Sequence, residues 1–186
     1  MSISTSAEDV LGFWFSERVK PLWFNATPTF DQELAERFLT VYRAAAAGAL
    51  LDWEETPEGA LALVVILDQF PLNLFRNQPE SFATEAESRH VAERAIAHGF
   101  DNTLRDEQKT FLYMPFMHSE DLADQDRSVA LYEQAGSGLG ENLKFAHHHR
   151  EIVRRFGRFP HRNSILGRDS TPEEIAYLNS KEAFLG

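Results

Sequence analysis

The sequence contains no cysteine among its 186 residues. Disulfide bonds, thiol nucleophiles and cysteine-ligated metal sites are therefore excluded. Lysine is scarce as well, with four Lys against 14 Arg. Long apolar runs are also missing, because the most apolar stretch, ALALVVIL at residues 60–67, is much too short to span a bilayer. These absences indicate a chain without a transmembrane helix and without thiol chemistry.

Positive charge is limited, and the formal net charge is −11. An acidic surface repels phosphate backbones and anionic lipids, so we expect neither nucleic acid nor a membrane as a partner. The opening residues, MSISTSAEDVLGFWF, show no basic segment before a long apolar run, and we expect no signal peptide and a cytoplasmic location. P-loop, dinucleotide-binding and nucleophile-elbow motifs are absent, and we expect no cofactor.

Helix signals dominate what is present. Apolar residues make up 43% of the chain and include 15 Phe, enough for a buried core. Thr-Pro pairs begin predicted helices at Thr27, Thr56 and Thr171, and Thr171 with Glu174 forms a capping box. We expect all-α structure, with about eight helices in an antiparallel stack and one domain over residues 1–186. The expected helices cover residues 27–48, 56–70 (ended by Pro71), 85–98, 105–114 (ended by Pro115), 119–136 (capped by Ser119), 141–157 and a segment from 171.

A basic turn, RFGRFPHRN at residues 155–163, stands out in this acidic chain. Residues 150–168 carry six Arg and one acid, a net charge of +5 that leaves −16 on the remainder. Gly157 ends the preceding helix, Pro160 stiffens the turn, and Phe156 and Phe159 can anchor it in the core. The side chains then available to bind an anion are Arg155, Arg158, His161, Arg162 and Asn163. We expect a partly open anion pocket here with His118 and Asp68 nearby; the alternative is that the arginines pair with internal acids and helix carbonyls.

Two further segments carry polar side chains in unusual places. Asp68 and Gln69 follow a wholly apolar helix, and a carboxylate at a helix C-terminus needs a partner such as Arg. A structural Asp–Arg pair is the alternative to a site there. His118 precedes a predicted helix N-terminus, where anions can bind. Glu120 and Asp121 are expected in the first turn of that helix, where acids compensate the helix dipole.

Three consecutive histidines, His147–His149, suggest metal binding at first sight. Neighbouring residues on a helix point about 100° apart, so these side chains cannot converge, and we expect no metal. His149 alone shares the apolar face of its helix. It is either a hydrogen-bonded core residue or a ligand contact.

Several stretches together resemble one bacterial family of unknown function, DUF924. They are DVLGFWF, LWF, FDQEL, LALVVILDQFPLNLFR, FLYMPFMHSED, FGRFPHRNSILGR and STPEE with the following YL. The resemblance covers nearly the whole chain and implies a tetratricopeptide-like right-handed superhelix, but no activity. Leu72 departs from the family pattern, in which Arg is usual. The residues that follow the pattern are Asp68, Gln69, Asn73, Arg76, His118, Ser119, Glu120, His149, Arg155, Arg158, His161, Arg162, Asn163 and Arg168.

Three functions are compatible with this sequence. The first is a binding module whose groove takes a small anionic molecule or a peptide end, through Arg76, Gln69, His149 and the basic turn. The second is a hydrolase with His118 or His161 as general base, held by Asp68 or Glu120. The third is a structural or protein-interaction protein. A bound anion at Arg158, His161 or Arg162 would favour a site, whereas a fully paired network would favour structure.

Overall fold

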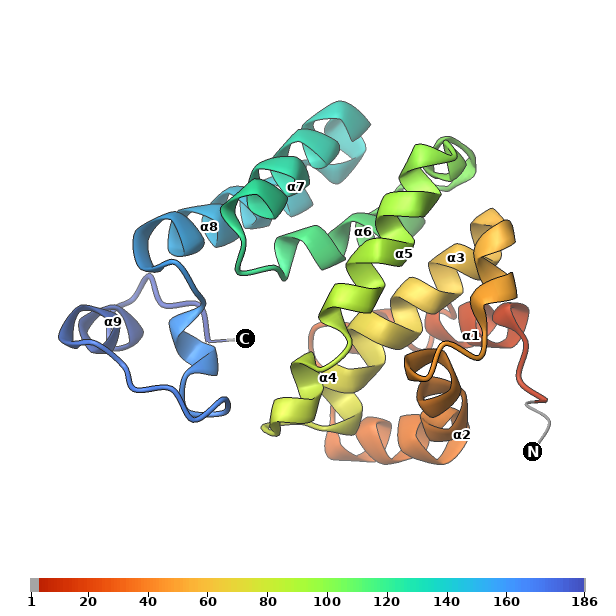
Figure 1. Ribbon diagram of the computed structural model, residues 1–186, viewed down its shortest axis with the longest axis horizontal. Helices are drawn as coiled ribbons and strands as arrows, with labels where there is room; N and C mark the ends of the chain where they lie inside the picture. The colour runs from red at the N-terminus through yellow and green to blue at the C-terminus, as the bar shows by residue number, and fades with distance from the viewer. Residues whose placement is uncertain (1–3, 186) are drawn as a thin grey trace. The chain divides into compact units, whose positions relative to one another are not determined.

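The structure is a computed structural model that describes residues 4–185, and its regular secondary structure in these residues is helical (Figure 1). No strand occurs in these residues, and the all-α prediction is confirmed. Across the same range, none of the helices combines the length and the apolar character needed to cross a lipid bilayer.

The described chain forms two compact units. The first contains the residues up to Arg76 together with Glu80–Pro115, and the second contains Asn77–Pro79 and the residues from Phe116 onward. The single domain over 1–186 and the tetratricopeptide-like superhelix stay predictions.

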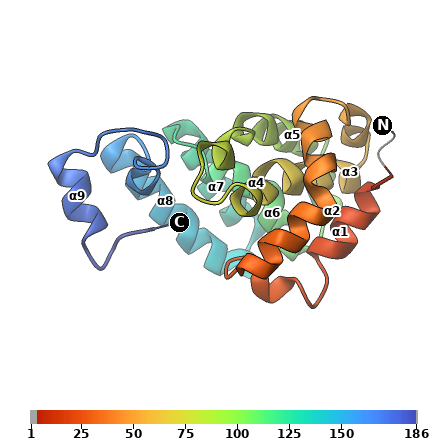
Figure 2. The same ribbon diagram turned by 90° about the horizontal axis from the view of Figure 1, so that it is seen from below.

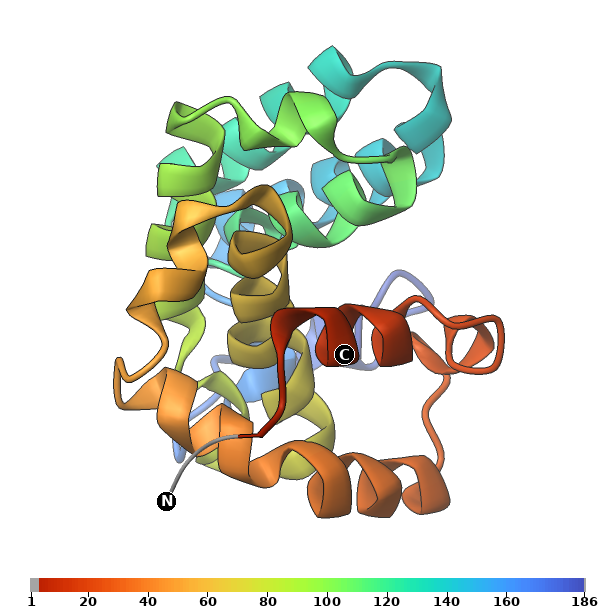
Figure 3. The same cartoon turned by 90° about the vertical axis from the view of Figure 1, so that its right-hand side faces the viewer.

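The first unit is built around buried aromatic rings. Trp14 is fully buried, and its ring centroid lies 5.6 Å from those of Phe70 and Phe111. Helix α3 packs against α1 and α5, and α2 packs against α4 (Figure 3). The helices are α1 (Ala7–Trp14), α2 (Pro28–Ala46), α3 (Pro57–Val64), α4 (Phe70–Leu74), α5 (Glu85–Ala97) and α6 (Asp106–Met117), whose last two residues belong to the second unit.

The second unit contains α7 (Leu122–Ala135), α8 (Gly140–Phe156) and α9 (Pro172–Leu178). Helices α7 and α8 lie side by side (Figure 1 and Figure 2). A 3₁₀ turn, Pro160–Arg162, follows α8 and contacts α9. Ile152, Val153, Phe159 and Tyr177 form the buried cluster that joins α8, this turn and α9.

Most helix boundaries follow the local sequence signals. The side chains of Thr27, Thr56 and Thr171 each accept a hydrogen bond from the backbone N–H three residues on, which confirms the three predicted starts. Gly99 and Gly157 adopt left-handed conformations, with φ of 71° and 69°, after α5 and α8. These helix boundaries can be predicted from the sequence because a cap involves only residues within one turn of the helix end.

Pro71 does not end its helix, contrary to the prediction. The chain passes from α3 through a π-helical segment, Val65–Gln69, into α4 and continues to Leu74. Pro71 lacks an N–H, so the Leu67 carbonyl four residues earlier loses its helical donor. The buried Thr84 hydroxyl donates to this carbonyl instead, at 2.6 Å. Asp68 and Gln69 therefore lie inside a continuous helical segment and not at its C-terminal end.

Pro115 does not end α6 either, which runs on to Met117. Phe116 and Met117 are both buried, so continuing the helix keeps two large apolar side chains out of water. The fully buried amide of Gln125 closes the helix, because it donates to the carbonyls of Met117 and Ser119, each at 2.6 Å. A distant side chain therefore sets this helix end.

The start of α7 was predicted two residues too early. Asp121, not Ser119, is the N-cap, and its carboxylate accepts from Ala123 N–H at 2.7 Å. Ser119 lies in the preceding loop, where its hydroxyl donates to Asp124 at 2.6 Å and accepts from Asp121 N–H at 3.1 Å. Glu120 is therefore a loop residue and not a first-turn acid.

Gly59 in the first turn of α3 leaves no room for a side chain. A Cβ atom there would lie 2.0 Å from the Trp53 carbonyl oxygen and 2.8 Å from the Thr56 hydroxyl. We expect Gly59→Ala to lower the free energy of unfolding by about 1–3 kcal/mol, because the backbone must shift. Gly12→Ala in α1 is the control, since no atom lies within 4 Å of its added Cβ, and it should raise stability by about 0.5–1 kcal/mol. Urea denaturation measures both; equal effects of the two substitutions would contradict the prediction.

Candidate functional site

The basic turn is held by its two phenylalanines, as predicted. Phe159 is 1% exposed. Phe156 is half-buried, and its ring centroid lies 5.1 Å from that of Tyr177. The turn between them bends at Gly157 and then forms the short 3₁₀ segment that begins at Pro160. The side chains of this turn therefore start from a fixed backbone.

Arg158 pairs with a buried carboxylate. Glu174 is 2% exposed and accepts from Arg158 Nε at 2.7 Å and from Arg158 Nη2 at 2.9 Å. Asn163 and the Thr171 backbone N–H also donate to Glu174, at 3.2 Å and 2.8 Å. These donors, Arg158 first, lower the pKa of Glu174 to about 2 although burial opposes them. The Glu174 carboxylate is thus an ionised centre that ties the turn to α9.

Arg168 forms a second ion pair of the same kind. Its guanidinium donates to both oxygens of Glu120, at 2.6 Å and 2.9 Å, and to Asn163 Oδ1 at 2.9 Å. The backbone N–H of Phe159 also donates to Glu120, at 2.8 Å. Burial alone raises the pKa of Glu120, but the hydrogen bonds from Arg168 and Phe159 outweigh it, so the pKa lies below its ordinary value. Glu120 thereby connects the loop before α7 to the basic turn.

Two other arginines predicted to bind an anion also have carboxylate partners. Arg155 donates to Glu173 at 3.2 Å in an exposed pair. Arg76, in the first unit, donates to both oxygens of Asp31 at 2.8 Å and 3.0 Å. The internal pairing that the sequence left open as an alternative therefore exists at Arg76, Arg155, Arg158 and Arg168. Anion binding by Arg155, Arg158 and Arg76 stays a prediction.

Arg162 differs from these four because it is buried, at 6% exposure. Its guanidinium carbon lies 4.7 Å from the centroid of the Phe159 ring, a cation–π contact. Phe159 thus supports a cation as well as anchoring the turn.

Histidines from separate elements meet beside this cation. His149 is 5% exposed, its ring centroid lies 5.5 Å from that of Phe159, and its Nδ1 donates to the Phe145 carbonyl at 2.8 Å. Burial lowers the pKa of His149 to about 3; the Phe145 carbonyl opposes this, and repulsion from His118, His148 and His161 adds to it. His149 is therefore a neutral, hydrogen-bonded core residue at neutral pH.

His161 differs from His149 because one of its ring nitrogens lacks a hydrogen-bond partner among residues 4–185. Its Nδ1 is buried and has no hydrogen-bond partner in the part of the chain that the structure describes. Burial lowers the pKa of His161 to about 4, with further lowering from the charges of Arg162, His118 and Arg168 against the opposing charge of Glu120. A buried ring nitrogen without a hydrogen-bond partner is costly whether it carries the proton or the lone pair.

Phe184 completes the group, and no feature of the sequence pointed to it. Its ring centroid lies 4.4 Å from that of His149, 5.1 Å from that of His161 and 6.3 Å from that of His148. Phe184 stands outside every predicted helix and motif, so no local pattern could have placed it. Glu174 was recognised only as a helix cap, because the TPEE pattern does not reveal a remote Arg partner.

Asp68 and Gln69 lie in the first unit, in its π-helical segment. Both are buried, and Gln69 donates to Asp68 at 2.5 Å and to the Met114 sulfur at 3.2 Å. Asn73 donates to the Gln69 carbonyl at 3.2 Å. His118, Glu120, His149 and the basic turn belong to the second unit. The catalytic assignments of His118, His161, Asp68 and Glu120 stay predictions.

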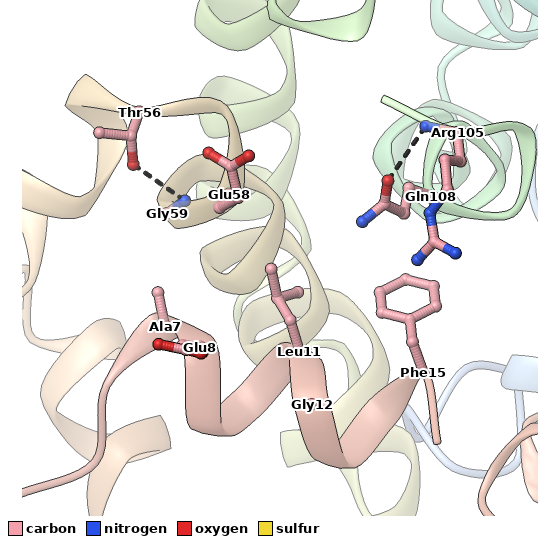
Figure 4. A pocket seen from close by; sticks show the side chains of 10 residues that line it. All are labelled: Ala7, Glu8, Leu11, Gly12, Phe15, Thr56, Glu58, Gly59, Arg105 and Gln108. Carbon is pink, nitrogen blue, oxygen red and sulfur yellow. Dashed lines mark hydrogen bonds between the residues drawn. The ribbon is translucent and has the colours of Figure 1, made fainter. Parts of the chain in front are cut away.

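A surface pocket of about 670 Å³ lies elsewhere, in the first unit (Figure 4). None of the sequence-predicted site residues lines it. Two of its polar side chains serve local structure, since Thr56 accepts from Gly59 N–H at 3.1 Å and Gln108 accepts from Arg105 N–H at 3.0 Å. Arg105 itself pairs with Glu107 at 2.9 Å. This pocket therefore does not gather the groups that the sequence singled out.

The chemistry available to the histidine group is that of neutral imidazoles beside cations. Histidines with pKa values near 3 and 4 are weak bases at neutral pH, which disfavours general-base catalysis by His149 or His161. Ser119 donates to Asp124 and serves the helix start, so its hydroxyl is used structurally. Among residues 4–185, no three His, Asp or Glu side chains are arranged to hold a metal ion.

Comparison with known proteins gives a family without an assigned activity. The family described as "Bacterial protein of unknown function (DUF924)" matches residues 10–182. A solved structure, of the protein of unknown function ATU0120 from Agrobacterium tumefaciens, is similar with a TM-score of 0.88 and 42% sequence identity, over 93% of this chain and 96% of that one. No curated protein matches the chain. The chain therefore belongs to the DUF924 family, which confirms the resemblance seen in its sequence.

Proposed function

We propose that the second unit is a binding module for a small anion, a carboxylate or a phosphate carried by a small molecule or a peptide end. The observation that carries this proposal is the buried, unpartnered Nδ1 of His161 among cationic neighbours. In the tautomer that carries its proton on Nδ1, His161 has an N–H that lacks an acceptor, and an oxygen of a bound anion would supply one.

The local electrostatic potential favours an anion over a cation. Burial is the main cause of the lowered pKa of His161, and the charges of Arg162, His118 and Arg168 lower it further against the opposing charge of Glu120. A bound anion would offset this excess of positive charge, and hydrogen bonds between imidazole and a charged oxygen are stronger than neutral ones. The pKa of His161 should therefore rise when an anion binds.

The paired arginines support the site without being its ligands. Arg158 with Glu174, and Arg168 with Glu120, fix the turn on which His161 and Arg162 stand. A turn held in this way keeps His161 in one orientation before a ligand arrives, which reduces the entropy lost on binding. On this proposal Arg158 positions the site, and His161 and Arg162 contact the ligand.

Phosphate binding followed at His161 tests the proposal. We expect phosphate to raise the melting temperature of the parent protein and to raise the pKa of His161, read from its ring proton shifts by NMR. The substitution His161→Gln should abolish the stabilisation by phosphate. His147→Gln is the matched control, because His147 is exposed on α8 and lies 3.8 Å from Glu133. It should leave the phosphate response unchanged.

Two results would contradict this function. One is that neither phosphate nor acetate changes the melting temperature or the His161 ring proton NMR shifts of the parent protein. The other is an unchanged phosphate response in His161→Gln. Either result would favour a purely structural role for the Arg and His side chains of the turn.

A further inference from the structure

The segment that follows α9 folds back onto the histidine group. Phe184 donates its backbone N–H to the Tyr177 hydroxyl at 2.9 Å, and its ring lies against His149 and His161. Glu182 and Leu185 are exposed, whereas Ala183 and Phe184 are partly buried, and Phe184 is the large apolar side chain of the two.

The ring contacts have the geometry of an aromatic-binding cage. The Phe184 ring meets His161 edge to face, with planes 81° apart, and is tilted by 60° to the His149 ring. Edge-to-face and tilted contacts at these distances are the favourable arrangements for aromatic pairs. The cage therefore holds a six-membered ring beside His161, the residue on which the proposed function rests.

We propose that Phe184 occupies the ring-binding part of the anion site, and that the physiological ligand is an aromatic carboxylate that displaces it. The inference rests on the proposed function, because the carboxylate of such a ligand would bind at His161 and Arg162 while its ring replaces that of Phe184. Residues 180–185 then act as a built-in competitor that a ligand with a ring must move.

The attachment of the segment is weak enough for displacement. Within the described chain, two hydrogen bonds tie residues 180–185 to α9, and both go to Tyr177. The backbone N–H of Ser180 donates to its carbonyl, and that of Phe184 donates to its hydroxyl, each at 2.9 Å. Phe184 also packs, partly buried, against the hydrophobic cluster that joins α8, the turn and α9. Its ring contacts are each a modest contribution. A segment held in this way opens more readily than α8 or the ion-paired turn.

Removing the ring should reveal the competition. We expect Phe184→Ala to bind benzoate about tenfold more tightly than the parent protein, since the closed state no longer has to be opened first. Acetate and phosphate have no ring, and their affinities should stay unchanged. Leu185→Ala is the matched control, because Leu185 is the adjacent exposed residue, at 70% exposure, and it should bind benzoate as the parent does. Titration followed by the NMR shifts of His161 measures all three probes in all three proteins.

The possible outcomes separate this inference from the proposed function. If phosphate binds to the parent but Phe184→Ala gains no affinity for benzoate, the competitor is disproved and the anion site stands. If Phe184→Ala tightens all three probes equally, the segment is a general cover and the aromatic ligand class is wrong. If no probe shifts His161 in any protein, the anion site itself fails. Phe184→Leu, which keeps apolar bulk without a ring, replaces Phe184→Ala if the latter does not fold, and the same gain is expected.

Discussion

The substitution Glu174→Ala is expected to lower the free energy of unfolding by about 3 kcal/mol, the largest loss among single changes in the second unit's ion pairs. The Glu174 carboxylate is buried and accepts from Arg158, Asn163 and the Thr171 backbone. Its removal leaves these donors without their acceptor and breaks one of the two bonds of the capping box at the start of α9. Urea unfolding followed by circular dichroism gives the size of the loss.

The neighbouring acid provides the control for this prediction. Glu173 pairs with Arg155 at 3.2 Å, but its side chain is 65% exposed. Exposed ion pairs contribute little, so Glu173→Ala should change stability by less than about 1 kcal/mol. A loss at Glu174 as small as that at Glu173 would show that the buried pair does not hold the turn.

Acid should weaken the protein well above the pH at which its carboxylates titrate. The folded-state pKa of His149 is about 3, against an ordinary value of 6.5. Between these two pH values His149 is protonated in the unfolded chain and neutral in the folded chain. The free energy of unfolding therefore falls as pH falls below 6.5. From pH 7 to pH 5 the loss through His149 alone is expected to be about 2 kcal/mol. His161, with a pKa of about 4, adds a loss of the same sign in this window.

The ion-paired carboxylates lose their contribution to stability at lower pH than the histidines do, so the two losses can be measured separately. Glu174 has a lowered pKa of about 2, so its contribution is complete above its ordinary value of 4.5 and is lost only as pH falls through that range. Urea unfolding at pH 7, 6 and 5 therefore isolates the histidines. We expect the parent to lose stability over this interval and His149→Gln to lose distinctly less. If the free energy of unfolding falls equally with pH in the two proteins, His149 is not the cause of the loss.

The predicted helix ends failed where a distant side chain replaces a local signal. Pro71 looked like a stop because it lacks an N–H, yet Thr84, 17 residues from Leu67, supplies the missing donor. Pro115 looked like a stop as well, yet α6 continues into the buried Phe116 and Met117 and is closed by Gln125. Sequence rules for helix ends describe a single segment and do not include donors from other segments.

The basic turn was recognisable because its signals lie within nine residues. Gly157, Pro160 and the two phenylalanines fix the backbone whatever surrounds them, and the Phe159 anchor is confirmed. The partners of its charges were not recognisable. Arg158 pairs with Glu174, 16 residues away, and Arg168 with Glu120, 48 residues away, while other acids lie nearer in sequence. Which acid meets which arginine depends on how helices pack.

By itself, then, the sequence determined the all-α class, the Thr-capped helix starts, the left-handed Gly157 and the rigid basic turn. Each of these follows from backbone geometry and hydrogen bonding within one or two helical turns. The tertiary structure alone decided the carboxylate partners of the arginines and the meeting of His149, His161 and Phe184. Their contacts join α8, the turn after it and the segment after α9. Burial and electrostatic coupling arise only when separate segments pack together, and no local pattern encodes them.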